Sequence, residues 1–99
     1  MELLQLRYFV SVARSENITK AAQMHNIPQP AMSQTIARLE RELGGVRLFD
    51  RKNGRIFLNE QGRTFLRYAE KALQSIDDGV LALKCSEDRI VGSIRVLVM

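Results

Sequence analysis

The chain has 99 residues, of which 45% are hydrophobic and 26% are charged, a composition typical of one small globular domain with a modest core. The net charge is +4, and all of the excess lies in residues 1–59, which hold nine Lys and Arg against five Asp and Glu, whereas residues 60–99 hold six of each. This asymmetry predicts that the first part of the chain meets a polyanion, although a basic surface that only aids solubility has the same charge.

One His, one Cys and no close cluster of carboxylates exclude a convincing catalytic site or metal cage. We therefore expect no enzyme, no metal and no cofactor. Cys85 cannot form an intramolecular disulfide, and we interpret it as a free surface thiol rather than a redox switch. No apolar run is long enough to span a bilayer and the first residues do not form a signal peptide, so we expect a cytoplasmic protein without a membrane partner.

The first predicted helix spans Leu3–Ser15, where apolar residues recur at helical spacing. Its inner stripe consists of Leu6, Phe9, Val10 and Ala13, flanked by Leu3 and Val12. A second, short helix is predicted for residues 19–25, capped by Asn17 or Thr19. A third helix follows after a very short connection, and two helices so joined are typical of a helix-turn-helix, whose second helix enters the major groove of DNA.

The third helix is the element around which the chain is organised. Pro30 suits its first turn and Gly44 suits its end. Its inner face consists of Met32, Ile36, Leu39 and Leu43. Its outer face consists of Pro30, Gln34, Ala37, Arg38 and Arg41, with Ser33 and Gln29 at the N-terminal flank. This outer face carries amides and guanidinium groups but no carboxylate at its centre, which predicts a DNA recognition helix.

A β-hairpin is predicted between residues 45 and 58, because apolar and β-branched residues flank Asn53-Gly54, a strong signal for a two-residue turn. That turn places Phe49 opposite Leu58, Arg51 opposite Ile56, and Lys52 opposite Arg55. Two cations directly opposite each other repel, and a nearby phosphate would relieve the repulsion. We interpret the hairpin as a wing with a basic tip of Arg51, Lys52 and Arg55, and the alternative is a solvated turn with incidental charge.

The last predicted helix runs from Glu60 to about Ser86, capped by Asn59. Its apolar seam consists of Leu66, Ala69, Leu73, Ile76, Val80 and Leu83, at near-heptad spacing. A helix of this length reaches about 40 Å, more than so small a domain can cover. Two interpretations of the seam are intramolecular core and dimer contact. We expect core near Phe65 and a homodimer seam beyond Ala72.

Residues 89–99 break the helical pattern with a run of apolar and β-branched side chains, as in a strand of a parallel sheet. The predicted organisation is therefore a winged helix-turn-helix at 1–58, a linker and dimerisation helix at 59–88, and at 89–99 either the start of a truncated C-terminal effector domain or a loose tail. The predicted fold class is mainly α with a small β-hairpin.

Several blocks, in this order and spacing, resemble the N-terminal domain of the LysR-type transcriptional regulators. They are Leu6-Arg7-Tyr8-Phe9, Thr19-Lys20-Ala21-Ala22, Gln29-Pro30-Ala31-Met32-Ser33, Ile36, Leu39-Glu40, Glu42-Leu43-Gly44, Leu48-Phe49-Asp50-Arg51 and Gly62. The resemblance implies a winged helix-turn-helix, dimerisation through the linker helix and a DNA target with dyad symmetry. It also implies a following ligand-binding domain of two α/β lobes, which begins with the strand at residues 93–98 and alone would bind a small-molecule effector.

The chain departs from the family pattern at four places. Pro28 stands where the family usually has a capping Ser or Thr, and His25 replaces a core leucine, for which we predict a partly buried, hydrogen-bonded role. The link Gly44-Gly45-Val46 is one residue longer than usual. Gln34 replaces a common Arg, which should change the base preference, because Arg favours guanine and Gln favours adenine.

The predicted function is sequence-specific binding of double-stranded DNA by a homodimer that regulates transcription. The residues predicted to face base edges or nearby phosphates are Gln29, Pro30, Ser33 and Gln34. Those predicted to hold the DNA backbone are Thr19, Lys20, Arg38, Arg51, Lys52 and Arg55. The alternative is a helical protein-interaction module whose basic face meets an acidic partner, which accounts for the charge asymmetry and the seam but not for the basic hairpin.

Overall fold

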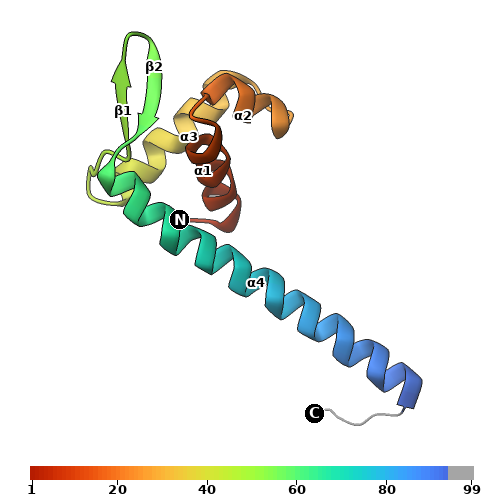
Figure 1. Ribbon diagram of the computed structural model, residues 1–99. Coiled ribbons are helices and arrows are strands. Elements are labelled where there is room, and N and C mark those ends of the chain that lie inside the picture. Colours follow the sequence, from red (N-terminus) through yellow and green to blue (C-terminus); the bar gives the residue numbers. More distant parts are fainter. Residues whose placement is uncertain (94–99) are drawn as a thin grey trace.

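The computed structural model describes residues 1–93. Within them the elements are α1 (Leu3–Ser15), α2 (Ile18–Met24), α3 (Gln29–Glu42), β1 (Phe49–Lys52), β2 (Arg55–Leu58) and α4 (Glu60–Ser93). Figure 1 shows α1, α2 and α3 gathered around one centre, the hairpin standing at one end of this group, and α4 extending far beyond it. The predicted fold class, mainly α with a small hairpin, is confirmed.

One hydrophobic core joins the three short helices, the hairpin and the first part of α4. Its largest fully buried side chains are Phe9, Met32, Leu39, Leu48 and Val12. The ring of Phe9 lies 5.7 Å from that of Phe49 and 5.4 Å from that of Phe65, centroid to centroid. The inner faces predicted for the first and third helices are confirmed, except that Leu3 is exposed and Gln5 is buried instead.

The hairpin forms with the predicted turn. Asn53 and Gly54 have φ values of 53° and 72°, the left-handed values that a type I′ turn requires of both central residues. The register is also as predicted and pairs Phe49 with Leu58, Asp50 with Phe57, Arg51 with Ile56, and Lys52 with Arg55. Phe49 and Ile56 are buried, so the base of the hairpin is attached to the core while its tip projects away from it.

The first turn of α4 lies close to the start of the hairpin. The predicted cap is confirmed, because Oδ1 of Asn59 accepts a hydrogen bond from the backbone N–H of Gly62 at 2.8 Å. A Cβ atom on Gly62 would lie 2.1 Å from the carbonyl oxygen of Leu48. Only glycine therefore permits this approach of the first turn of α4 to the residue before β1.

The predicted seam of α4 divides into two parts, and the first part packs into the chain's own core. Ala69 and Leu73 are buried in the chain's own core, and Leu66 packs against that core. The boundary that we placed after Ala72 is therefore wrong at Leu73. A regular apolar stripe does not tell which partner covers it, and here α1 lies along α4, where Arg14 binds Glu70 at 2.8 Å and Arg7 binds Asp77 at 3.2 Å.

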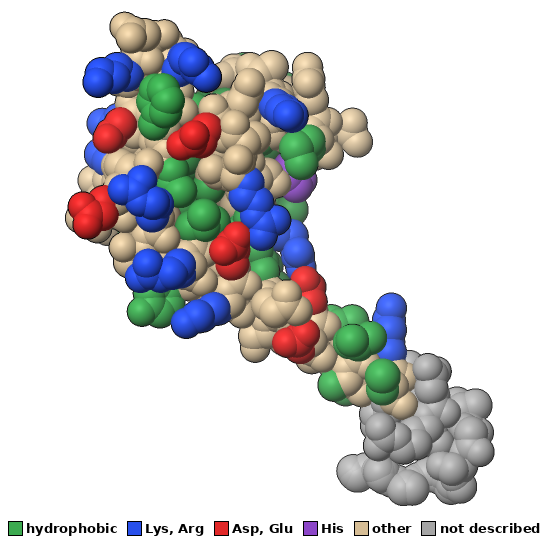
Figure 2. Space-filling model, in the orientation of Figure 1, with side chains coloured by type: hydrophobic (Ala, Val, Ile, Leu, Met, Phe, Trp, Pro, Cys, Tyr) green, Lys and Arg blue, Asp and Glu red, His purple; other side chains and the backbone are tan. Residues whose placement is uncertain are grey.

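Beyond α1 the apolar side chains of α4 are exposed. Ile76 is 44% exposed, Val80 49% and Leu83 72%. Figure 2 shows hydrophobic side chains gathered on this far part of the helix, away from the three-helix group. These three residues, which we call the α4 ridge, are the part of the predicted seam that stays available to a second copy.

The helix also ends later than predicted. It continues to Ser93, so residues 89–93 are helical and do not begin a strand. Residues 80–91 contain neither Gly nor Pro, and β-branched residues such as Ile90 and Val91 cost a helix only a few tenths of a kcal/mol each, about 0.5 or less. The rest of the predicted strand, residues 94–99, lies outside the described residues. Across residues 1–93, every helix is too short or too polar to cross a membrane.

Candidate nucleic-acid interface

The turn between α2 and α3 is built by local backbone contacts. Asn17 caps α2, its side chain accepting a hydrogen bond from the backbone N–H of Lys20 at 2.8 Å. The backbone N–H of Ile27 donates to the carbonyl of Ala22 at 3.0 Å and turns the chain towards α3. Pro28 precedes α3 in an extended conformation and supplies no side-chain cap, as its identity predicted.

The start of α3 presents an amide and a hydroxyl on its outer face. Gln29, Pro30 and Gln34 are exposed and Ser33 is half-buried. Nε2 of Gln29 donates a hydrogen bond to Oγ of Ser33 at 3.2 Å, one turn further along the helix. This bond holds the Gln29 carboxamide along the helix surface, where its remaining donor and acceptor can pair with the edge of a base.

The wing carries the predicted cations at its exposed end. Arg51, Lys52 and Arg55 are all exposed, and Lys52 lies directly opposite Arg55 in the ladder. The guanidinium carbon of Arg55 lies 5.7 Å from the centroid of the Phe57 ring, a cation–π contact. Figure 2 shows Lys and Arg side chains at the end of the molecule where the wing stands. Like charges opposite each other favour an anion beside them.

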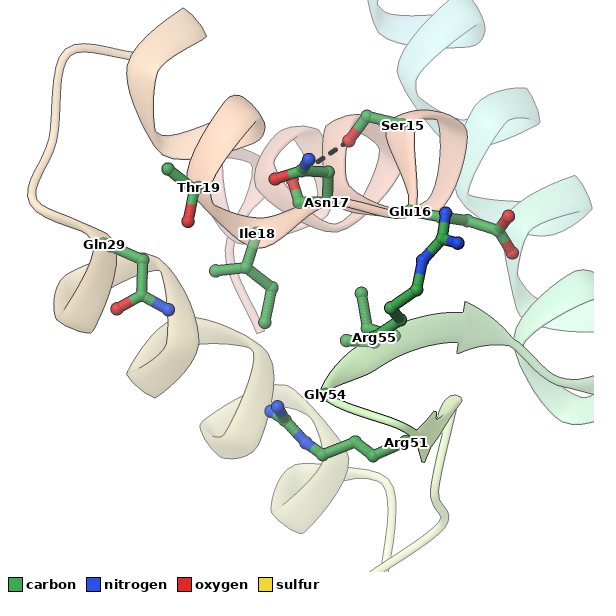
Figure 3. A pocket seen from close by; sticks show the side chains of 10 residues that line it. Ser15, Glu16, Asn17, Ile18, Thr19, Gln29, Arg51, Gly54 and Arg55 are labelled. Carbon is green, nitrogen blue, oxygen red and sulfur yellow. Dashed lines mark hydrogen bonds between the residues drawn. The ribbon is translucent and has the colours of Figure 1, made fainter.

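A polar cleft of about 270 Å³ joins these elements. It lies between the turn before α2, the start of α3 and the wing, and four predicted residues line it: Thr19, Gln29, Arg51 and Arg55. Figure 3 shows the Arg51 side chain reaching from the hairpin towards α3, with Gln29 and Thr19 on the opposite wall. The fold therefore brings together groups that lie far apart in the sequence.

The other predicted residues lie outside this cleft. Lys20, Pro30, Ser33, Gln34 and Lys52 are not among its lining residues. Arg38 lines a different hollow, together with Thr35, Glu42 and the first residues of α1. Arg38 follows Gln29 by nine positions, which is roughly 13 Å along a helix, so one cleft cannot hold both ends of the outer face.

Sequence reasoning missed Glu16, which also lines the cleft. Its backbone is left-handed, with a φ of 51°, and Oε2 of its side chain accepts a hydrogen bond from the backbone N–H of Leu58 at 2.8 Å. Nothing in the local sequence signals either feature, because Glu rarely adopts this conformation and its partner is distant in the chain.

His25 has the structural role predicted for it. It is half-buried, and its Nε2 lies 2.6 Å from Oγ of Ser11 on α1. Its ring packs edge-on against Tyr8 at a centroid distance of 4.8 Å. The histidine therefore joins the end of α2 to α1.

Helices α2 and α3 are joined by a short turn, pack against α1 and are followed by a basic hairpin. This arrangement defines a winged helix-turn-helix, a class of DNA-binding domain. Residues 3–63 match the family described as "Bacterial regulatory helix-turn-helix protein, lysR family". The match covers more than half of the chain, which belongs to this family of transcription regulators.

Curated relatives share this part of the sequence. The regulator BsdA of Bacillus subtilis is 36% identical over 97 residues, covering 97% of this chain and 33% of its own length. The regulator BenM of Acinetobacter baylyi is 40% identical over 84 residues, covering 85% of this chain and 27% of its own length. The chain thus spans about a quarter to a third of the length of these relatives.

Solved structures of relatives share the fold. The DNA-binding domain of BenM in complex with benA site 1 DNA has a TM-score of 0.79 and 40% identity, covering 85% of this chain and 96% of that chain. Full-length CbnR in complex with its target DNA has a TM-score of 0.79 and 31% identity, covering 87% of this chain and 30% of that chain.

Proposed function

We propose that this chain binds specific sites on double-stranded DNA as a homodimer, with α3 in the major groove and the wing against the sugar-phosphate backbone. The observation that carries the proposal is the cleft in which Gln29 of α3 faces Arg51 and Arg55 of the wing. A base-reading amide and backbone-binding guanidinium groups then approach one duplex from one face. The DNA complexes of BenM and CbnR support the proposal through their similar fold.

The proposed roles follow from position. At the start of α3, we assign Gln29, Pro30, Ser33 and Gln34 to base edges or nearby phosphates, since recognition helices read bases with their N-terminal residues. The groups assigned to the DNA backbone are Thr19 and Lys20 of α2, Arg38 of α3, and Arg51, Lys52 and Arg55 of the wing. Arg38 would contact a phosphate outside the cleft, because it lines a different hollow.

The first test concerns base reading. We expect Gln29→Ala to reduce discrimination at one base pair by about 1–3 kcal/mol, the value of one good bidentate contact. The measurement compares binding to a site selected from a random oligonucleotide pool with binding to its single-base-pair variants. Gln61→Ala, at an exposed position of α4, is the control and should leave the pattern unchanged. Unaltered site selectivity in Gln29→Ala would show that the base-reading assignment is wrong.

The second test concerns the backbone. We expect Arg51→Ala to weaken binding to all sequences equally and to reduce the slope of log K against log salt by about 0.9, the value for one phosphate contact. Titrations of selected and unrelated duplexes over a salt series measure both effects. Arg67→Ala removes another exposed arginine, on α4, and should leave the slope unchanged. If both variants changed the slope alike, the wing would have no special role.

The dimer part of the proposal rests on the α4 ridge. Exposed apolar residues at heptad-like spacing are covered when two such helices pack together. A two-fold axis through this contact would present two copies of α3 to the same side of a duplex. Half-sites would then be separated by about 34–36 Å, one turn of DNA, or by a multiple of it.

For the whole protein, we propose a cytoplasmic transcription regulator without enzymatic activity, since curated relatives are regulators and bacterial DNA lies in the cytoplasm. The relatives are longer than this chain, so a small-molecule effector would bind to a part of the protein outside it.

A mobility-shift titration against mixed-sequence duplex DNA at low ionic strength tests the function as a whole. Binding that weakens steeply with salt is expected, because phosphate contacts release counterions. A helical module for an acidic protein partner would show no such binding to DNA, and that result would overturn the proposal.

A further inference from the structure

The residue between α1 and α2 has an unusual backbone. Glu16 has a φ of 51° and a ψ of 42°, the left-handed region that residues other than Gly seldom adopt. Its backbone N–H donates to the carbonyl of Val12 at 2.7 Å and closes α1. A non-glycine residue keeps such a conformation only where its surroundings hold it there.

The side chain of Glu16 reaches the wing. Oε2 of Glu16 accepts a hydrogen bond from the backbone N–H of Leu58, the last residue of β2, at 2.8 Å. The bond is charge-assisted and therefore stronger than one between neutral groups. Because a two-stranded ribbon is marginally stable by itself, a bond to the outer edge of β2 restrains it.

We propose that Glu16 is a positioning residue that clips β2 to the turn before α2 and so fixes the wing relative to α3. The proposal rests on the proposed DNA-binding function. Glu16 lines the same cleft as Gln29, Arg51 and Arg55, so a movement of β2 changes the separation between the wing cations and α3 (Figure 3). With the clip in place, the wing meets the backbone at a fixed distance from the groove that α3 reads.

The negative charge of Glu16 is unfavourable in a surface that binds DNA. A carboxylate on a residue that lines a DNA-binding cleft repels phosphate, so electrostatics alone would favour Gln at this position. The hydrogen bond that this carboxylate accepts from Leu58 holds the wing in place, and this is the role that we assign to it. Glu16→Gln separates the two effects, because the amide oxygen can still accept the bond from Leu58 while the negative charge is removed.

Glu16→Gly removes the clip without straining the backbone, because Gly adopts a positive φ freely. We expect the full chain with Glu16→Gly to remain folded and to bind its selected DNA site up to about tenfold more weakly, since only a fraction of molecules then hold the wing in place. Glu16→Gln should bind at least as tightly as the unaltered chain. Equal affinities of Glu16→Gly and Glu16→Gln, which both lack the negative charge, would overturn the proposal.

A combined variant separates positioning from a general effect on folding. In a chain that already carries Arg51→Ala, Lys52→Ala and Arg55→Ala, the wing has lost its cations and its position no longer matters. Glu16→Gly should then cause no further loss of affinity, whereas a general structural defect would cause the same fold loss in both backgrounds.

Amide hydrogen exchange tests the clip without DNA. The N–H of Leu58 should exchange slowly in the unaltered chain and in Glu16→Gln, and faster in Glu16→Gly. Unchanged exchange of this amide in Glu16→Gly contradicts the clip. Failure of the unaltered chain to bind DNA would instead refute the proposed function, so the two failures are distinguishable.

Discussion

Gly62→Ala is expected to lower the thermal unfolding midpoint by roughly 12–24 °C, corresponding to about 3 kcal/mol for a domain of this size. The new Cβ would lie 2.1 Å from the carbonyl oxygen of Leu48 and 2.5 Å from Cδ1 of Leu58. The first of these is a backbone atom, and it cannot move freely because it accepts a hydrogen bond from the backbone N–H of Asn59 at 3.1 Å. The clash must therefore displace the start of α4.

The amide of Leu48 is fixed as well, since its N–H donates to Oε2 of Glu40 at 2.7 Å. Thermal unfolding followed by circular dichroism, at one protein concentration, measures the effect. Thr64→Ala introduces the same side chain at an exposed position of the same helix and should change stability by no more than about 0.5 kcal/mol. Equal midpoints for the two variants would show that the first turn of α4 can shift at little cost.

Ile76→Asp is expected to convert the proposed dimer into a folded monomer and to weaken binding to a two-half-site duplex at least about a hundredfold. In the dimer a charge at this position would be buried without a partner, in both copies. In the single chain Ile76 is 44% exposed, so the fold itself should tolerate the change. Sedimentation analysis gives the mass, and titration against duplexes with one and two half-sites gives the loss of linked binding.

Ser75→Asp is the matched control for this prediction. It adds the same charge at the neighbouring residue, which is exposed and lies off the heptad-spaced ridge. It should remain dimeric and bind as the unaltered chain does. If Ser75→Asp weakened binding as much as Ile76→Asp, repulsion of DNA and not loss of the dimer would be the cause. A dimeric Ile76→Asp chain would show that the copies meet elsewhere.

Much of the fold was predictable because its signals are local. The bounds of α1 follow from apolar spacing, and the hairpin register follows from Asn53-Gly54, since a two-residue turn permits only one pairing of its flanking strands. The N-cap at Asn59 likewise depends on a side chain and a backbone N–H three residues later. The prediction failed at the end of α4, because a short apolar run such as residues 89–93 is compatible with either a strand or a helix.

The amino-acid sequence alone determined the order of the elements, the basic character of the wing and the apolar faces of the helices, because each depends on neighbours within a few positions. Only the tertiary structure decided that Leu73 belongs to the core and Ile76 does not, because the packing of α1 along α4 decides which turns are covered. It alone also placed Glu16 beside Leu58 and Gln29 across a cleft from Arg51. Contacts between residues so distant in the chain depend on how the helices pack, which no local pattern specifies.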